Sequence, residues 1–307
     1  MRPFQLLRRN LSYYWPIHLA VVLGVATAVA VLTGALSIGE SVRASLRELL
    51  LNRLGNVDLV ISATGYAREQ LAKDLESSNQ FSSHFQSACP LIMLEGIVTH
   101  QENRRRAFGV QVYGVDARFW MFHGKNLENR FQDDRSGGLS PSLSQELGVK
   151  PGDSVLLRVQ KPSAIPAEFL HGRRDDQGHT LRLNATPELA ALAEFSVRPQ
   201  QTDVRAVFVS LRRLQKELQL DGKINTILVS ERKRSQEWEH SKGQLETIIR
   251  ERFQLEDLGV KVRVLEQQHC LALESESALI NRDLERAARV TGDRLRFQTS
   301  SILTTGS

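Results

Sequence analysis

The 307-residue sequence has only two cysteines, Cys89 and Cys270, and no C-x-x-C spacing. This scarcity excludes a disulfide-rich scaffold and a zinc site built from cysteines. The expected state of both residues is a free, buried thiol. One long-range disulfide between them, in an oxidising compartment, is the alternative that the sequence leaves open.

The sequence motifs of common enzymes are also absent. The chain contains no G-x-x-x-x-G-K-[ST] phosphate-binding loop, no H-E-x-x-H zinc motif and no G-x-S-x-G nucleophile turn. Basic residues are dispersed, and the densest run is Arg104-Arg105-Arg106, without interleaved aromatic residues. Such a run is typical of a solvated hairpin end, so we predict no nucleic-acid binding.

Several polar residues are candidates for a metal or acid–base site, but their spacing favours solvated surface. His171 and His179 bracket a polar loop whose spacing fits no regular metal geometry. Adjacent carboxylates rarely face one pocket, and the later acidic residues suit an exposed helix face. These carboxylates are Asp133, Asp134, Asp175, Asp176, Glu274 and Glu276. We therefore predict no catalytic, cofactor-binding or metal-binding residue and no enzymatic activity.

Long apolar runs are absent apart from one, Pro16 to Gly39, which contains no Asp, Glu, Lys or Arg. A helix of that length rises about 36 Å, enough to cross a hydrocarbon core of roughly 30 Å. The three aromatic residues at 13–15 suit the belt at a membrane surface. A cleaved signal peptide is the alternative, but its apolar region normally has only about 7–15 residues. We predict an uncleaved transmembrane helix over residues 16–39.

The helix is expected to continue beyond the membrane as a stalk. Apolar residues recur at helical spacing between Val42 and Leu54, and no Gly or Pro interrupts residues 40–54. Gly55 is a natural C-terminal stop. A helix lying on the membrane surface is the alternative.

The arginines around the apolar segment leave its orientation undecided. Three precede it and three follow it, so the positive-inside rule favours neither direction. They are Arg2, Arg8, Arg9, Arg43, Arg47 and Arg53.

After residue 56, short β-branched runs alternate with helical patterns, which indicates an α+β fold. Ser136-Gly137-Gly138 is predicted to be a flexible joint, and residues 162–202 are expected to form loops between short β elements. Strands are predicted at 57–62, 90–100, 106–115, 154–159, 204–209, 225–229 and 260–265, and helices at 68–77, 141–147, 211–218, 236–253 and 273–289.

Four stretches carry a likeness to a known family. They are the apolar helix running into Gly39-Glu-Ser-Val-Arg43, the strand end Tyr113-Gly-Val-Asp116, the helix and turn of 139–154, and 206–215 followed by 223–229. In this order and spacing they resemble the extracytoplasmic core domain of MacB/FtsX-like ABC transporter permeases, a group that includes the lipoprotein-releasing permeases. The resemblance covers about residues 16–290.

The resemblance implies a division of the chain into a membrane segment and two lobes outside it. A porter-like βαβ subdomain would be made of two chain segments, with a β-rich lobe inserted between them. The expected divisions are a cytoplasmic N-terminus (1–15), the transmembrane helix (16–39), the stalk helix (40–56), the first porter-like segment (57–110), the β-rich inserted lobe (111–203), the second porter-like segment (204–290) and a C-terminal segment (291–307).

The resemblance also implies partners and a location. It predicts a bacterial inner-membrane protein with a cytoplasmic N-terminus, an extracytoplasmic domain, an ABC ATPase subunit as partner, and no cofactor. Because such permeases work in pairs, a homodimer or paired permease is expected. Gly24 and Ala28 form a small-x-x-x-small pair that would allow close approach of two helices, although lipid-facing small residues are an equal reading.

The sequence departs from the family in one respect. Such permeases carry three further membrane helices after this domain, and no second apolar run of that length occurs here. The chain is therefore expected to be a fragment, a truncated gene product, or a protein that kept only the first helix and the core domain. Two functions follow: a non-catalytic permease core that couples ATP-driven movement to a substrate or partner, or a stand-alone membrane-anchored scaffold. An extracytoplasmic hydrolase is least supported, because no nucleophile–base pair is found.

Overall fold

The computed structural model describes residues 3–125, 135–160, 178–186, 194–198, 202–232, 238–265, 270–275 and 282–294. The chain divides into two compact units, Met1–Arg53 and Leu54–Ser307. The first unit is helical, and the second contains the β-sheets.

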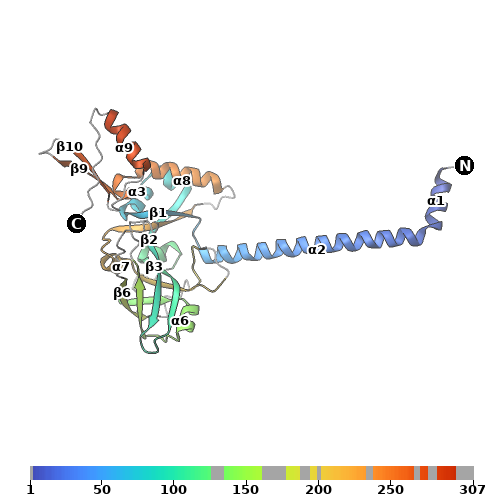
Figure 1. Ribbon diagram of the computed structural model, residues 1–307, viewed down its shortest axis with the longest axis horizontal. Coiled ribbons are helices and arrows are strands. Elements are labelled where there is room, and N and C mark those ends of the chain that lie inside the picture. Colours follow the sequence, from blue (N-terminus) through green and yellow to red (C-terminus); the bar gives the residue numbers. More distant parts are fainter. Residues whose placement is uncertain are drawn as a thin grey trace. The chain divides into compact units, whose positions relative to one another are not determined.

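The first unit holds α1 (Pro3–Tyr13) and all but the last residue of α2 (Trp15–Leu54), which are drawn in blue in Figure 1. α2 is one helix of 40 residues. Within the described chain, it alone is long and apolar enough to cross a membrane. The hydroxyls of Thr27 and Thr33 donate to carbonyls of the preceding turn, so the helix satisfies them internally. The predicted continuation of the apolar helix through Leu54 is confirmed.

The second unit has a mixed α+β fold built on one eight-stranded sheet with the order β1-β8-β2-β3-β7-β4-β6-β5. A separate two-stranded sheet pairs β9 with β10. The strands are β1 (Leu59–Arg68), β2 (Phe85–His100), β3 (Arg106–Val115), β4 (Ser136–Leu139), β5 (Ser154–Val159), β6 (His179–Ala185), β7 (Ala206–Ser210), β8 (Lys223–Glu231), β9 (Val260–Leu265) and β10 (Cys270–Ser275). The helices are α3 (Gln70–Glu76), α4 (Asn79–His84), α5 (Ala117–Phe122), α6 (Pro141–Leu147), α7 (Leu211–Glu217), α8 (Trp238–Arg252), the 3-10 helix η2 (Leu255–Leu258) and α9 (Arg282–Arg294).

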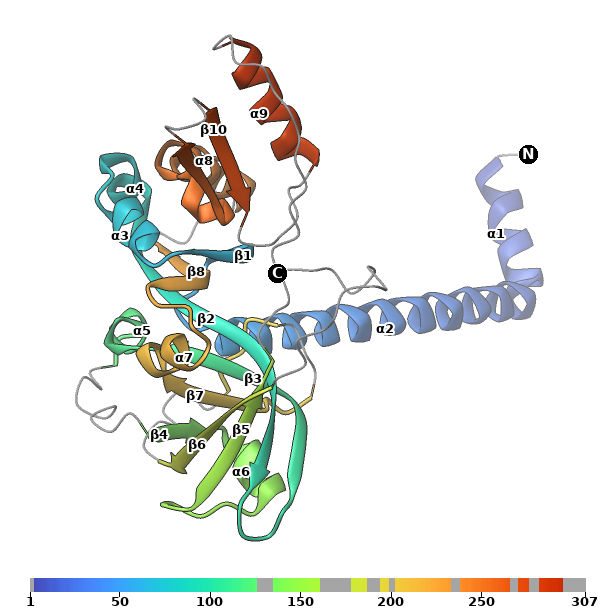
Figure 2. The same ribbon diagram turned by 60° about the vertical axis from the view of Figure 1, so that its left-hand side comes forward.

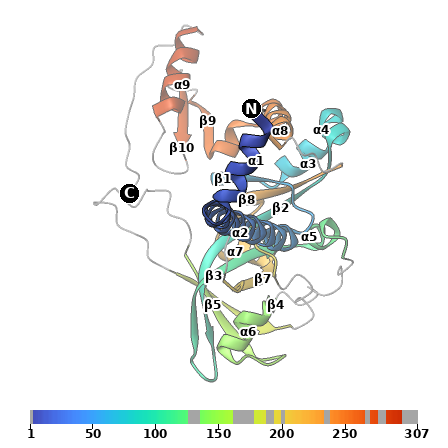
Figure 3. The same cartoon turned by 90° about the vertical axis from the view of Figure 1, so that its right-hand side faces the viewer.

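Strand β2 is shared by two regions of the large sheet. Its first half, from Phe85 to Leu91, pairs with β8. Its second half pairs with β3 on one edge and with β5 on the other. Because β3, β7, β4, β6 and β5 follow one another in the sheet, this double pairing closes a six-stranded barrel. Figures 2 and 3 show β2 as the long curved strand that runs into this barrel.

The barrel is filled by side chains that alternate inward along its strands. Small branched residues dominate this interior, as expected for strands that pack on one face. Helix α6 adds Leu143 and Leu147 to the same core. It begins where the sequence predicts, with Ser140 as N-cap and Gly148 ending it in the left-handed conformation. The buried strand residues include Val98, Val110, Val112, Val155, Leu157, Val159, Leu181, Leu183, Val207 and Val209.

The rest of the large sheet is an open antiparallel region, made of β1, β8 and the first half of β2. Helices α3 and α4 contact this region, and α8 packs against both helices. Leu75 of α3, Phe81 of α4 and Leu245 of α8 join the hydrophobic core. Where β2 leaves β8, the Asn225 side chain accepts from the Met93 N–H and donates to the Met93 carbonyl, both at 2.8 Å. β2 therefore changes partners without leaving these backbone groups unpaired.

The predicted flexible joint at residues 136–138 is wrong. These residues belong to β4, and Gly137 and Gly138 are buried between β6 and β7. A Cβ on Gly137 would lie 3.1 Å from two side-chain carbons of Leu183. The glycine therefore serves close packing inside the barrel rather than flexibility.

Two other boundaries differ from the sequence prediction. The helix predicted at 273–289 is displaced, because residues up to Ser275 form β10 and α9 begins at Arg282. The predicted lobe boundary at residues 110 and 111 falls inside β3, and β2 and β7 complete the barrel from the flanking segments.

Candidate functional site

The chain enters the second unit through a short segment after α2. Gly55 ends the helix with a left-handed backbone, φ 60°. A Cβ at this position would lie 2.9 Å from Nδ1 of His123. Both the backbone conformation and the close approach therefore require glycine, which confirms the predicted helix stop.

Hydrogen bonds hold the residues that follow. The Asn56 side chain donates to the Phe122 carbonyl at 2.9 Å, and the Asp58 N–H donates to the Val229 carbonyl at 3.0 Å. The Asp58 carboxylate accepts from the Glu231 N–H at 2.9 Å. The entry segment, residues 55–58, is thus fixed both to the end of α5 and to β8, the middle strand of the open region.

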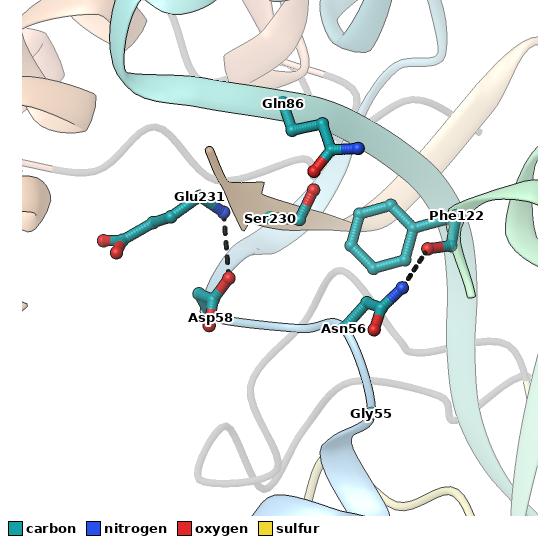
Figure 4. Close-up of a pocket in the computed structure, with 7 residues that line it drawn as sticks. All are labelled: Gly55, Asn56, Asp58, Gln86, Phe122, Ser230 and Glu231. Atoms are coloured by element: carbon teal, nitrogen blue, oxygen red, sulfur yellow. Dashed lines mark hydrogen bonds between the residues drawn. The ribbon is translucent and has the colours of Figure 1, made fainter. Parts of the chain in front are cut away.

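A pocket of about 220 Å³ lies beside the entry segment (Figure 4). Among the residues that the structure describes, its lining includes no histidine, cysteine or lysine. The Ser230 hydroxyl lies 2.8 Å from the Ser87 hydroxyl rather than beside a base. The pocket therefore offers hydrogen bonds and negative charge, not a nucleophile–base pair. The lining residues are Gly55, Asn56, Asp58, Gln86, Phe122, Ser230 and Glu231.

A second pocket, of about 640 Å³, borders the barrel. Its lining residues come from the β3 bulge, from α6 and from the segment before β7, and they are almost all polar. The Arg205 guanidinium pairs with the Glu146 carboxylate at 2.7 Å across it. Within the described chain, no group of three or more histidine, cysteine or acidic residues could hold a metal ion.

A polar network joins the start of α3 to α5 and α7. Asp116 caps α5 by accepting from the Arg118 N–H at 2.9 Å, and the Arg118 guanidinium pairs with both Asp116 and Glu69. Gln215 of α7 donates to Glu69 at 2.9 Å. Burial acts to raise the pKa of Glu69, but the hydrogen bonds from Gln215 and Arg118 outweigh it, so this pKa lies below its ordinary value.

Two residues of α5, Phe119 and Trp120, pack into a buried aromatic cluster. Its other members are Tyr113, Phe195 and Phe208.

His123 caps α5 and packs edge-on against Phe119, Phe122 and Phe195, with ring centroids 4.8–5.2 Å apart. Burial, helped by the charge of Lys125, lowers the pKa of His123 to about 4. The ring that touches the entry segment is therefore neutral at neutral pH.

Those residues singled out in the sequence that the structure describes do not come together in this region. Arg104, Arg105 and Arg106 lie exposed at the β2–β3 hairpin end, where the sequence places them. His179 begins β6, and Glu274 lies on β10, near Arg263 at 3.7 Å, rather than on a helix. Outside the described residues lie His171, Asp133, Asp134, Asp175, Asp176 and Glu276.

The structure settles the state of one cysteine. Cys89 is a free thiol buried in β2, and burial raises its pKa above the ordinary range. The side chain of Cys270 lies outside the described residues.

The entry segment and its supports are missed by sequence reasoning apart from Gly55. Helix α5 has only six residues, too short to show helical periodicity. Asp116 followed by Ala-Arg-Phe-Trp-Met-Phe is a capping signal that could have located it. The contact between Gly55 and His123 has no sequence signal, because it joins distant regions of the chain.

One family model matches most of the sequence. The sequence model described as "MacB-like periplasmic core domain" matches residues 19–237, more than two thirds of the chain. No curated protein matches the sequence.

Among solved structures, the periplasmic region of MacB from Actinobacillus actinomycetemcomitans has 10% identity and a TM-score of 0.38, covering 83% of this chain and 100% of that one. The extracellular domain of the noncanonic ABC-type transporter YknZ from Gram-positive bacteria has 9% identity and a TM-score of 0.38, covering 62% and 92%. A domain of a putative permease from Porphyromonas gingivalis has 11% identity and a TM-score of 0.30, covering 70% and 84%.

The matched region begins inside α2 and runs through the barrel and the open region to the residues before α8. It therefore includes the entry segment, both pockets and the aromatic cluster. On this match, the chain belongs to the MacB-like periplasmic core domain family of ABC transporter permeases.

Proposed function

We propose that the chain is the membrane-anchored extracytoplasmic core of an ABC transporter permease. In this role it is not a catalyst. Movement driven by an ATPase subunit in the cytoplasm passes along α2 to the second unit, which handles a substrate or partner outside the membrane. The open region would act as the porter-like subdomain and the barrel as the inserted lobe.

One observation carries the proposal: the family match starts within an apolar helix that continues without a break to the entry segment. A continuous helix transmits displacement along its axis, because each turn is bonded to the next. The entry segment is bonded to β8 and α5 in turn. A movement of the helix end would therefore reach the central strand of the open region.

The test is a break in the stalk. Ser45 is exposed in α2, and Ser45→Pro would interrupt the helix at a cost of about 3 kcal/mol. The full chain would be purified with its ATPase in nanodiscs, with spin labels on the second unit. We expect ATP to change the distance between labels on paired permeases in the wild type and in the Ser45→Ala control, but not in Ser45→Pro. ATPase binding should persist in all three.

The alternative is a stand-alone membrane-anchored scaffold. Failure of the full chain to co-purify with any ATP-binding subunit would favour that function and would count against the permease proposal.

The orientation has its own test. We propose that the N-terminus is cytoplasmic and that the second unit is outside. In intact cells, a membrane-impermeant maleimide should label Ser82→Cys, an exposed position on α4, and should leave Ser12→Cys unlabelled. The reverse pattern would overturn this orientation.

Pairing of the permease would involve the apolar segment of α2. Gly24 has no atoms near its Cβ position within the single chain. If two copies approach at Gly24 and Ala28, Gly24→Ile should lower the cross-linked dimer fraction, whereas the same change at Gly34 should not.

A further inference from the structure

Four neighbouring strands of the barrel, β3, β2, β5 and β6, lie side by side (Figure 2). Two rows of outward-facing side chains cross them. In the first row, Arg106 is the direct partner of Thr99. Thr99 is also the partner of Leu156, and Leu156 is the partner of Arg182. Direct partners in antiparallel strands point to the same side of the sheet, so these four side chains share one face.

The second row lies beside the first. Ile97 is the partner of Arg158, and Arg158 is the partner of Thr180. Opposite Ile97, the register of β3 shifts at a bulge in which Gly109 has a φ of 65°. Such a bulge re-aims the adjacent side chain. That side chain is Phe108, which is 60% exposed.

The arginine face, as we call Arg106, Phe108, Ile97, Leu156, Arg158 and Arg182, has an excess of positive charge. The two rows contain three exposed arginines and no carboxylate. The next outward residue on β2 is Glu95, and it already pairs with Arg198 at 2.9 Å. In the described chain, no acidic side chain is paired with the three arginines of the face.

The neighbouring backbone leaves room for one of these guanidinium groups. A Cβ at Gly178, just before β6, would overlap the Arg158 side chain. Glycine at this position therefore lets the arginine lie across the start of β6.

We propose that the arginine face binds an acidic surface of a partner protein. Exposed aromatic and arginine side chains are the types that dominate the energy of protein interfaces. The guanidinium groups would bind carboxylates in the bidentate manner open to arginine but not lysine. Phe108 would enter an apolar pocket between those carboxylates. A membrane surface is disfavoured, because Phe108 is the one large apolar side chain of the face that is mostly exposed, whereas Ile97 and Leu156 are partly buried and leave little else to insert.

The proposal deepens the proposed function, since it names the class of partner that the second unit would meet. Its test makes no use of ATP hydrolysis. The photo-cross-linker p-benzoylphenylalanine would replace Phe108 in the full chain in cells of the native host. The control position is Met121 on α5, which is 52% exposed. We expect a protein adduct from position 108 and none from position 121.

The decisive step uses the captured protein in purified form, with the full chain in nanodiscs. The triple variant R106E/R158E/R182E should weaken its binding by at least about tenfold, and Phe108→Ala alone by a similar factor. The matched control R232E/R250E/R252E changes the net charge equally at exposed positions after β8 and on α8, in the open region rather than on the barrel. It should change the affinity by less than about threefold. Circular dichroism and thermal unfolding would verify that every variant is folded.

Three results would overturn the proposal. One is equal weakening by both triple variants, which would indicate general electrostatic attraction. Another is an adduct only with lipid or with a second copy of this chain, checked by binding to vesicles containing phosphatidylglycerol and by sedimentation. The third is the lack of any adduct at position 108. Retained ATPase binding in the variants would separate each of these results from failure of the permease function.

Discussion

The barrel and the β9–β10 sheet hold their strands in different ways. Every barrel strand has a neighbour on both edges, and its inward side chains are buried. In the described chain, β9 and β10 pair only with each other. Three of their apolar side chains, Val262, Val264 and Leu271, are 49–64% exposed.

The β9–β10 sheet is connected to the open region through η2. There Asp257, which is 4% exposed, accepts from the Arg68 side chain at 2.8 and 3.0 Å and from the Arg68 N–H at 3.0 Å. Stability in the barrel is therefore distributed over many contacts, whereas the connection through η2 depends heavily on one carboxylate.

The largest expected effect tests the barrel, where stability is distributed over many contacts. Gly96 lies where β2 meets β3 and β5, and a Cβ there would lie 2.8 Å from the Arg158 carbonyl. Gly96→Val should lower the free energy of unfolding of the whole domain by about 3 kcal/mol or more, because backbone must move. Denaturant unfolding measures this.

The control for that change is Gly65→Val in β1, where the Cβ position is open. It should stay within about 0.5 kcal/mol of the wild type. Equal losses at the two positions would contradict tight closure of the barrel at Gly96.

The next effect tests the connection through η2, which depends on the Asp257 carboxylate. Asp257→Ala should cost about 2 kcal/mol locally, because it leaves Arg68 without its bidentate partner. Hydrogen exchange should accelerate in η2, β9 and β10 and stay unchanged in the barrel. The exposed neighbour Glu256 provides the control substitution to alanine. Faster exchange in the barrel as well would show that the two regions unfold together.

The third effect concerns pH and the aromatic cluster. His123 has a folded pKa of about 4 against an ordinary value of 6.5. Between these values the unfolded chain binds more protons, so stability should fall as the pH drops from about 6.5 to 4. We expect His123→Phe to remove on the order of 1–3 kcal/mol of this pH-dependent loss.

The comparison for the histidine is His240→Phe, at an exposed position on α8. The two variants would be compared by thermal unfolding at about pH 7 and about pH 4.5, because most of the His123 titration lies between these values. The loss of stability at the lower pH should be smaller in His123→Phe than in His240→Phe. An unchanged pH dependence in His123→Phe would show that this ring is not a source of acid sensitivity.

The smallest effect returns to the barrel. The Ser140 hydroxyl caps α6, donates to the Val204 carbonyl at 2.6 Å and accepts from the Ala206 N–H at 3.1 Å. Ser140→Ala should lower the free energy of unfolding by about 1 kcal/mol, measured by denaturant unfolding. Ser142→Ala, in the first turn of the same helix, should cost less. A larger loss at Ser142 would mean that the cap is not what holds α6.

The sequence was sufficient for elements whose signal is local. Three such elements carry their own periodicity or cap, and the structure confirms them. They are the helical run from Pro16 to Leu54, the stop at Gly55 and the Ser140–Gly148 helix. Family membership followed from the order of such segments.

Features that depend on distant partners could not be predicted in this way. From the sequence alone, Gly137 indicates a flexible joint. Its role in close packing is visible only once Leu183 is seen to lie against it. Barrel closure requires the pairing of β2 with β5, which no single segment encodes. The arginine face likewise exists only because the register aligns arginines from three strands across the outside of the barrel. In the candidate site, the same limit concealed the contact of His123 with Gly55.

Closure of the barrel also has a consequence in time. β3 ends at Val115, but its parallel neighbour β7 begins only at Ala206. At synthesis rates of about 5–20 residues per second, the ribosome needs roughly 5–20 s to make the intervening chain. Throughout that interval one edge of β3 awaits its partner while α2 has already been synthesised. Chaperones outside the membrane would therefore meet this domain as an unclosed sheet, and its yield in cells should depend on them more than its final stability suggests.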